Sequence, residues 1–326
     1  CDNMRVCVVG AGPAGTSFSV MLKRFRDDFD VTLFEGRSRP RSYCAGGLGF
    51  LVLPDLMRYD FVNKALTASV EAIINRCVLV LRSSKTGIAS VEFTSKDVNR
   101  RLGVVLDRRK FDYELLKIAI REGVEYISNT WIKVLEPKRV VSSDGREFKC
   151  DVVVDARGSQ AWDYRTCDDM EFTYQAYVPT NLGDTAYILI NMDLIRRGYV
   201  WMFPGGKYDK VGFGESLKHF SKDLIRKFKE TYISTFTVAR EEASLLPLSG
   251  KVVLYSNGVF RVGTAAGLIN PLHGGGIAYA VLSGIALAEV LRYADRTSRN
   301  ILQLMYSLKK QVEKIKLEIK LSRKVR

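Results

Sequence analysis

The chain has 326 residues, of which 47% are hydrophobic and 26% are charged. This length suits about two domains, and the composition excludes a disordered, collagen-like or disulfide-scaffold chain. Fifty lysines and arginines against 36 carboxylates give a net charge of +14. That balance favours anionic partners, which include phosphates, nucleic acid and acidic lipid headgroups.

The first elements form a strand, a glycine turn, a helix and a second strand. An apolar run at 5–9 precedes Gly10, Gly12 and Gly15; helical spacing follows to about Lys23, and the run 31–34 ends at Glu35. In such a turn the first glycine allows the tight bend, the second lets the backbone approach a pyrophosphate, and the third lets the helix pack closely. An acid 20 residues after the third glycine suits an adenosine ribose hydroxyl. The pattern predicts dinucleotide binding, and a purely structural turn is the alternative.

The middle of the chain alternates between strand-like and helical patterns. We predict antiparallel strands over about 70–95, a helix over 111–123, further strands to Val154 with a hairpin turn at 143–146, a larger β-sheet over 170–215, a helix over 220–236, short strands over 252–262 and a long helix over about 275–293. The longest apolar stretch, Ile277–Leu291, is interrupted by Ser283, Gly284 and Glu289. It predicts a buried helix rather than a membrane span.

A second glycine-rich stretch covers residues 263–267 and 273–277. Such a junction between strand and helix suits close backbone approach to a ring or ribityl chain, with the helix N-terminus facing a flavin carbonyl. A dehydrogenase that binds only a nicotinamide does not need this element, and an ordinary loop is the alternative. Of the two histidines, His273 in this loop is a candidate for ring contact, whereas His219 is expected at the surface.

The cysteines and the chain ends add further expectations. Six cysteines, at positions 1, 7, 44, 77, 150 and 167, show neither a CxxC pair nor regular spacing, so we predict no zinc or other metal site, no disulfide framework and a reducing intracellular setting. The apolar run in the first ten residues leaves no room for a signal peptide. From Ile301 onward an apolar stripe recurs at steps of three to four residues, formed by Leu304, Leu308, Val312, Ile315 and Ile319. Five lysines lie mostly off the stripe, which predicts a helix that lies on an anionic membrane or packs on its own protein.

Several motifs together resemble a known class of flavoenzyme. The N-terminal glycine turn, residues 107–112 (DRRKFD), 154–158 (VDARG) and 263–277 resemble the FAD-dependent oxidoreductases of the p-hydroxybenzoate hydroxylase structural class. Within that class, residues 43–48 (YCAGGL) and 199–204 (YVWMFP) are similar to the geranylgeranyl reductase family, including archaeal enzymes that saturate isoprenoid chains of membrane lipids. The similarity extends over nearly the whole chain to about residue 295.

The resemblance implies a fold and a division into domains. The fold class is α/β, with a Rossmann-like FAD-binding domain and an interleaved antiparallel-sheet substrate domain. We place the FAD-binding domain in residues 1–50, 97–165 and 250–295, the substrate domain in residues 51–96 and 166–249, and a C-terminal helical segment in residues 296–326.

The resemblance also implies roles for residues that match its motifs. Those expected to hold FAD are Gly10, Gly12, Ala14, Gly15, Glu35, Gly36, Arg108, Asp155, Gly158, Gly263, Thr264, Gly274, Gly275, Gly276 and Ile277. Cys44, Gly46 and Gly47 match the element beside the isoalloxazine and are the catalytic candidates. Tyr199, Trp201, Phe203 and Pro204 match the aromatic motif that lines the lipid cavity.

For two of these assignments, the residues are also consistent with a purely structural role. Cys44 is expected to position the alkene or relay its proton, or only to pack as a small buried thiol. Tyr199, Trp201 and Phe203 alternate along a strand, so they share one face, which suits a sheet core, a cavity wall or both.

The chain also departs from the family pattern. Arg196 stands where a proline is usual, and Thr264 stands where an aspartate is usual. A hydroxyl accepts hydrogen bonds less strongly than a carboxylate, so we expect weaker flavin binding there. The segment after residue 295 is shorter than in many family members, which predicts less complete closure over the substrate.

The implied function is flavin-dependent reduction of C=C bonds in geranylgeranyl chains of isoprenoid membrane lipids or their precursors. The chain has only one Rossmann fingerprint, so no separate nicotinamide-binding domain is expected. FAD would therefore be reduced by NAD(P)H that enters transiently or by ferredoxin. The expected partners are a prenyl lipid and an anionic membrane surface, not nucleic acid; the protein is expected to be a monomer or weak oligomer, in the cytoplasm at the inner face of the membrane. The alternatives are an FAD-dependent monooxygenase, a lycopene-cyclase-like flavoenzyme and a non-catalytic flavin- or prenyl-lipid-binding protein.

Overall fold

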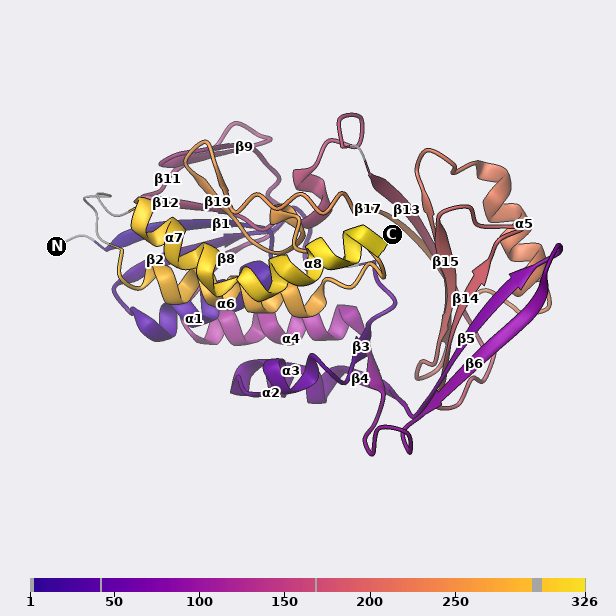
Figure 1. Ribbon diagram of the computed structural model, residues 1–326. Helices are drawn as coiled ribbons and strands as arrows, with labels where there is room; N and C mark the ends of the chain where they lie inside the picture. The colour runs from indigo at the N-terminus through magenta and orange to yellow at the C-terminus, as the bar shows by residue number, and fades with distance from the viewer. Residues whose placement is uncertain (1–2, 42, 168, 295–300, 326) are drawn as a thin grey trace.

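Two sheets of different type organise the chain. A computed structural model describes residues 3–41, 43–167, 169–294 and 301–325. A mainly parallel six-stranded sheet with helices packed along it lies at one end of the molecule, and a mainly antiparallel seven-stranded sheet lies at the other (Figure 1). This confirms the α/β class with an antiparallel sheet interleaved in the chain.

The six-stranded sheet carries the predicted strand, turn, helix and strand. Its strands, in spatial order, are β18 (Tyr255–Ser256), β19 (Val259–Arg261), β12 (Val152–Asp155), β1 (Met4–Val9), β2 (Phe29–Phe34) and β8 (Glu125–Ile127). All neighbouring pairs are parallel except β18 and β19. Helix α1 (Pro13–Phe25) connects β1 to β2, and its proline lies in the first turn, where no N–H is needed.

Helices α1, α4 (Arg108–Arg121) and α6 (Ile277–Leu291) bury their apolar sides in the largest core of the protein. Helices α1 and α6 lie in close contact, since a Cβ atom at Gly284 would stand 2.3 Å from the Ala14 carbonyl oxygen. The predicted buried helix is therefore confirmed as α6. No helix of the described ranges is long and apolar enough to cross a bilayer.

The seven-stranded sheet has one face packed and one face turned toward the six-stranded sheet. Its strands, in spatial order, are β17 (Arg240–Pro247), β13 (Met170–Val178), β16 (Asp209–Ser216), β15 (Gly198–Phe203), β14 (Thr185–Asn191), β5 (Arg76–Ser83) and β6 (Gly87–Thr94). Helix α5 (Lys222–Tyr232) covers the outer face, where Phe228 packs with Val200, Val211 and Phe213. The predicted sheet over 170–215 and the strands within 70–95 are confirmed.

Two small sheets complete the fold. Strands β3 (Gly47–Gly49), β7 (Gly103–Leu106) and β4 (Val70–Ile74) form one, and β11 (Glu147–Lys149), β10 (Arg139–Ser142) and β9 (Ile132–Glu136) form the other, with the predicted hairpin turn between β10 and β11. The buried Lys210 of β16 joins the first small sheet to the seven-stranded sheet. Its Nζ donates to the Leu106 carbonyl oxygen at 2.7 Å and pairs with Glu71 Oε2 at 2.6 Å.

The boundary that we predicted at residue 51 differs from the packing observed. Helices α2 (Leu53–Met57) and α3 (Asp60–Ser69) bury Leu56, Phe61 and Val62 in the largest core, together with α4. Their apolar residues therefore belong with the six-stranded sheet. The chain enters the seven-stranded sheet only at β5.

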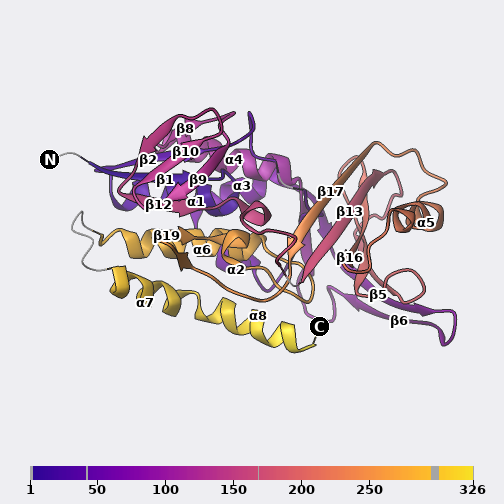
Figure 2. The ribbon, with the colours of Figure 1, turned by 90° about the horizontal axis from the view of Figure 1, so that it is seen from above.

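The C-terminal segment forms two helices rather than one. Helices α7 (Ile301–Gln311) and α8 (Glu313–Val325) run alongside α6 (Figure 2) and meet at Val312. Leu308, Val312, Ile315 and Ile319 are buried in the largest core, whereas most of the lysines between them are exposed. Of the two alternatives, packing on the protein itself is therefore the one observed for this stripe; the Leu304 side chain lies outside the described set.

One cysteine prediction is wrong, because Cys7 and Cys150 form a disulfide. Cys7 lies in β1 and Cys150 two residues before β12, so the parallel pairing of these strands brings together cysteines that are 143 residues apart. Sequence spacing carries no trace of a pair that is created by strand order. Cys44, Cys77 and Cys167 are free thiols.

We expect this disulfide to stabilise the six-stranded sheet. The Cys150→Ala variant should lose about 2–4 kcal/mol of unfolding free energy, because the crosslink closes a long loop in the unfolded chain. Urea unfolding of wild type and variant, each with and without reductant, measures this difference. The Cys167→Ala variant is the control, and a wild type that is equally stable with and without reductant would contradict the expectation.

Candidate active site

One large cavity of about 1430 Å³ lies between the two sheets. It extends from the glycine turn after β1 to the inner face of the seven-stranded sheet. The predicted residues that line it are Gly10, Gly12, Ala14, Glu35, Gly36, Cys44, Gly46, Gly47, Arg108, Gly158, Tyr199, Trp201, Phe203, Thr264, Gly274, Gly275, Gly276 and Ile277. Four predicted residues, Gly15, Asp155, Pro204 and Gly263, lie behind this lining.

The glycine turn is built to leave space beside α1. Gly10 has a positive φ of 109°, and a Cβ there would stand 2.4 Å from the Ala156 carbonyl oxygen. A Cβ at Gly15 would stand 2.1 Å from the Gly10 carbonyl oxygen, so both glycines are required by packing. Gly12 differs, because a Cβ there would meet nothing within 4 Å. The fold does not need a glycine at 12, but a ligand that approaches the helix N-terminus does.

Glu35 is held in place at the end of β2. Its carboxylate accepts hydrogen bonds from the backbone N–H groups of Ala11 at 3.3 Å and Arg37 at 3.1 Å. Burial raises the pKa of Glu35 above its ordinary value, although these backbone donors oppose the shift. The carboxylate is thus oriented beside the glycine turn, where it can accept from ribose hydroxyls.

The sequence did not reveal the aromatic residue next to Glu35. A Cβ at Gly36 would stand 2.4 Å from the Trp131 ring, so this glycine lets the indole lie against the backbone. The Arg37 guanidinium lies 5.6 Å from the Trp131 ring centroid, and both residues line the cavity. Trp131 is 44% exposed, so part of the indole is accessible from the cavity. A single tryptophan just before β9 has no periodic signal that would have marked it.

The second glycine-rich stretch lines the same half of the cavity as the glycine turn, at the end away from that turn. The short helix η2 (Gly263–Ala266) precedes the loop that leads into α6, and Gly276 caps α6 without any side-chain hydrogen bond. The Trp162 indole N–H donates to the Thr264 carbonyl oxygen at 2.8 Å and fixes η2. The first turn of α6 therefore meets the cavity with its positive dipole end, which favours a group that gains negative charge.

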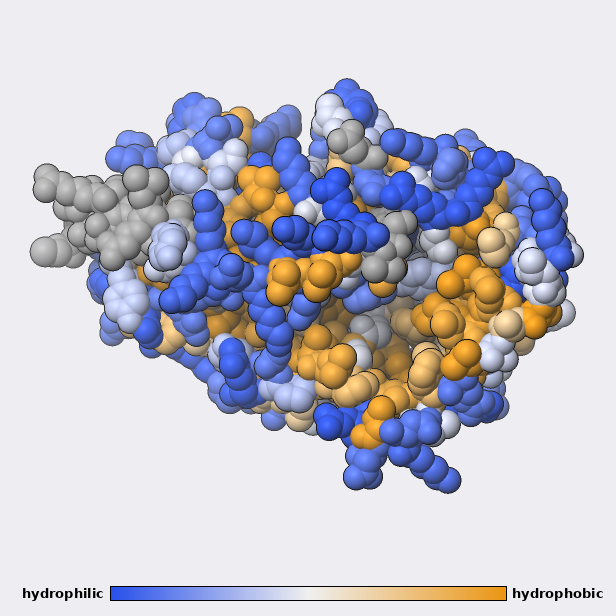
Figure 3. Space-filling view, in the orientation of Figure 1, coloured by the Kyte–Doolittle hydropathy of each residue, from blue (hydrophilic) through white to orange (hydrophobic). Residues whose placement is uncertain are grey.

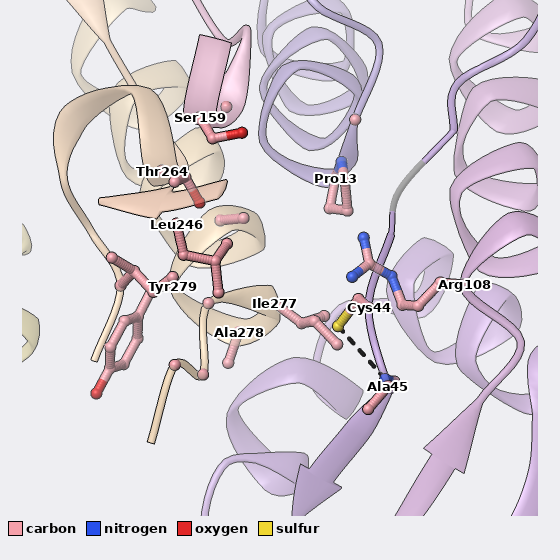
Figure 4. A pocket seen from close by; sticks show the side chains of 18 of the residues that line it. Pro13, Cys44, Ala45, Arg108, Ser159, Leu246, Thr264, Ile277, Ala278 and Tyr279 are labelled. Carbon is pink, nitrogen blue, oxygen red and sulfur yellow. Dashed lines mark hydrogen bonds between the residues drawn. The ribbon is translucent and has the colours of Figure 1, made fainter. Parts of the chain in front are cut away.

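Cys44 lies between two hydrogen-bond donors on the other side of the cavity (Figure 4). The Gly46 N–H donates to Cys44 Sγ at 3.3 Å, and the Arg108 guanidinium interacts with the thiol. Arg108 is buried and pairs with the fully buried Asp112 at 3.0 Å. Burial opposes its charge, but Asp112 and then Cys44 outweigh that effect and raise the pKa of Arg108. The sulfur therefore lies beside a buried positive charge.

The alternating aromatic residues of β15 form a cavity wall. Tyr199, Trp201 and Phe203 all line the cavity, whereas Val200 faces α5 in the opposite core. A Cβ at Gly212 would stand 2.4 Å from the Trp201 ring, and one at Gly47 would stand 2.7 Å from the Phe203 ring. Because these two glycines have no side chain, they leave room for the rings of Trp201 and Phe203. The motif therefore forms a cavity wall, and Trp201 is also buried.

Tyr199 connects this wall to the second glycine-rich stretch. Its hydroxyl donates to the His273 carbonyl oxygen at 2.7 Å, and the His273 imidazole accepts from the Gly275 N–H at 3.2 Å. Burial, with smaller contributions from Glu171 and Cys44, raises the pKa of Tyr199. The phenol therefore stays protonated near neutral pH.

Polar residues on β13 and β17 also line the cavity, and the sequence motifs did not predict them. The side chains that line the cavity there include Glu171, Thr173, Gln175, Glu242 and Ser244. Glu242 is buried, pairs with Arg109 at 2.7 Å and accepts from the Tyr177 hydroxyl at 3.0 Å. Alternating polar residues on a strand usually indicate a solvent-facing side. Here the strand order turns that side toward the cavity, which is polar at β13 and β17 and apolar toward β14.

Helix α8 closes part of the cavity. Lys314, Ile315, Glu318, Leu321 and Ser322 contribute to its lining. The Tyr279 hydroxyl donates to Glu318 Oε2 at 2.6 Å, and Asn270 donates to the Ser322 hydroxyl at 3.0 Å. The C-terminal segment thus forms part of the cavity wall.

The chain is similar in sequence and fold to known proteins. A family model described as lycopene cyclase protein matches residues 5–180, which include the glycine turn, Cys44, Arg108 and the strand β12. The chain belongs to the lycopene cyclase protein family. The predicted resemblance of this family member to geranylgeranyl reductases is confirmed by relatives that carry such names.

Two curated relatives and one solved structure illustrate this. The digeranylgeranylglycerophospholipid reductase of Methanocella arvoryzae is 28% identical, over 88% of this chain and 76% of the relative. Digeranylgeranylglycerophospholipid reductase 1 of Methanopyrus kandleri is 29% identical, over 91% of this chain and 84% of the relative. A geranylgeranyl bacteriochlorophyll reductase-like protein from Thermoplasma acidophilum has a TM-score of 0.82 at 20% identity, over 99% of this chain and 87% of that chain. The last comparison shows that this lycopene cyclase family member shares its fold with the Thermoplasma acidophilum protein over nearly the whole chain.

Proposed function

We propose that this protein is a flavin-dependent oxidoreductase that reduces C=C bonds in geranylgeranyl chains of phospholipids. The observation that carries the proposal is that one large cavity joins a dinucleotide cradle to an aromatic and apolar wall. The names of the relatives point to the same substrate class, a glycerophospholipid with geranylgeranyl chains.

The residues present fit FAD. The open space at Gly12 suits a pyrophosphate, Glu35 a ribose and Trp131 an adenine ring. At the other end, Thr264 and the uncapped start of α6 suit the ribityl chain and the ring system. When bound, reduced FAD supplies a hydride to the alkene carbon.

The protein supplies what the cofactor lacks. Tyr199, Trp201 and Phe203 bind the prenyl chain by apolar contact and exclude water from the alkene. We propose that the Cys44 thiol, held by Arg108 and the Gly46 N–H, delivers the proton that completes the saturation. Gly46 and Gly47 shape the loop that carries Cys44, and Phe203 packs on Gly47.

The electron donor and the setting are part of the proposal. The chain has one Rossmann fingerprint, so we propose that NAD(P)H enters transiently or that ferredoxin delivers electrons. We further propose that the protein works as a monomer or weak oligomer, in the cytoplasm at an anionic membrane surface. Anaerobic stopped-flow reduction of the flavin by each donor separately distinguishes the two sources.

A mass measurement tests the activity. The protein is reduced anaerobically and incubated with a geranylgeranylated glycerophospholipid, and we expect the lipid mass to rise by two hydrogens per double bond. Incorporation of oxygen in air would instead indicate a monooxygenase, and isomerisation or cyclisation without mass change would indicate a cyclase-type reaction. Tight lipid binding with no chemical change would indicate a binding protein.

A further inference from the structure

The cavity-facing side of the seven-stranded sheet continues beyond the cavity. Strand β14 pairs with β5 so that Ala186 lies beside Cys77, and Ile188 beside Leu79. Ala186, Cys77 and Ile188 line the cavity. Because side chains alternate along a strand, the following positions on the same side continue this face outward.

Five apolar residues occupy that continuation, which we name the apolar apron. They are Leu79, Leu81, Val91, Phe93 and Ile190. Leu79 lies opposite Val91, and Ile190 lies beside Leu81, so they form one surface across β14, β5 and the edge strand β6. Val91 is 53% and Phe93 49% exposed. Figure 3 shows apolar side chains gathered over these strands, next to the hollow between the two sheets.

The mouth of the cavity is apolar as well. Leu51 and Leu321 both line the cavity and are largely exposed, so they lie at its opening. Leu272 and Leu317 add further exposed apolar surface on the side of α6 and α8. A contiguous exposed apolar surface of this kind marks an interaction site rather than ordinary surface.

Positive charge accompanies the apron. Residues 76–101, which contain β5 and β6, hold six lysines and arginines but only two carboxylates. Lys85 lies in the turn between the strands, and Lys96, Arg100 and Arg101 follow β6, all of them exposed. An apolar strip beside exposed cations matches the layering of an anionic bilayer, with hydrocarbon next to charged headgroups. A second copy of this chain would instead bring the same positive excess against itself.

We propose that the apolar apron rests in the surface of an anionic lipid bilayer, with Leu79, Val91 and Phe93 as its anchors. A prenyl chain then passes from the bilayer along one continuous apolar sheet face into the cavity, without crossing water. This inference rests on the proposed function for the nature of the chain, and it assigns membrane contact to the sheet rather than to α7 and α8.

The experiment compares two faces of one hairpin in the full-length protein. Flotation with vesicles of phosphatidylcholine alone, or mixed with phosphatidylglycerol, measures binding at low and high salt. We expect wild type to float with the anionic vesicles in a salt-sensitive way. The Leu79→Ser/Val91→Ser/Phe93→Ser variant should bind about tenfold or more weakly, because partitioning scales with buried apolar area. Ile88→Ser is the matched control, since Ile88 is exposed on the opposite face of β6 and should not affect binding.

A second measurement does not depend on the triple variant. In Phe93→Trp the added fluorescence should be quenched by brominated lipid in anionic vesicles, whereas in Ile88→Trp it should not. Unquenched Phe93→Trp, wild-type binding by the triple variant, or no flotation of wild type would each overturn the proposal. The proposal would also be overturned if only the Lys309→Gln/Lys310→Gln substitution abolished vesicle binding. A triple variant that binds vesicles like wild type but has a lower mass in solution would overturn it as well.

Turnover separates this inference from the proposed function. The triple variant should reduce detergent-dispersed prenyl lipid at the wild-type rate but lose at least about tenfold of the rate on vesicle-embedded lipid. If wild type reduces neither form, the proposed function fails, while flotation and quenching still decide whether the apron binds a bilayer.

Discussion

The Gly12→Val variant is expected to fold normally and to lose its flavin. A Cβ at this position would meet nothing within 4 Å, and the backbone φ of −73° suits any residue. Replacing a glycine at a helix N-cap costs no more than about 1 kcal/mol. The same side chain fills the space that a pyrophosphate needs at the start of α1, so the dissociation constant for FAD should rise by at least about 100-fold.

Two measurements separate these effects. Thermal unfolding of the flavin-free proteins should give similar midpoints for wild type and Gly12→Val, whereas fluorescence titration with FAD should differ. Gly206→Val is the matched control, because Gly206 is exposed and lies outside the cavity lining. An unchanged affinity for FAD in Gly12→Val would mean that the glycine turn is only structural.

The second large effect is expected from Cys44→Ala. If the thiol delivers the proton, its removal should lower turnover of the prenyl lipid by about 100-fold, the lower limit for loss of a positioned acid. The thiol is small, so neither FAD affinity nor the rate of flavin reduction by the donor should change. Single-turnover oxidation of the reduced enzyme by the prenyl lipid isolates this step.

Further variants test the role of Cys44. Cys44→Ser should keep part of the activity, because a hydroxyl still holds a proton beside Arg108. Cys167→Ala removes a free thiol outside the cavity lining and serves as the control. Wild-type kinetics in Cys44→Ala would reduce Cys44 to a packing residue.

Local patterns determined much of the cofactor half of the site. Gly10, Gly12 and Gly15 with Glu35 mark a strand, turn, helix and strand, because the spacing of the three glycines and the acid is a local pattern. The alternation of Tyr199, Trp201 and Phe203 likewise placed them on one face. These signals are short-range, so a sequence contains them completely.

Strand order decided the rest. The parallel pairing of β1 and β12 brings Cys7 to Cys150, and the order of the seven-stranded sheet turns Glu171 and Glu242 toward the cavity. The stripe of α7 and α8 is equally amphipathic in both of its predicted settings, and only packing against the largest core shows that the protein itself covers it. The sequence determined which residues can bind a dinucleotide and a prenyl chain. Only the tertiary structure decided which polar and apolar faces meet, because those contacts join segments that are far apart in the chain and leave no periodic trace in it.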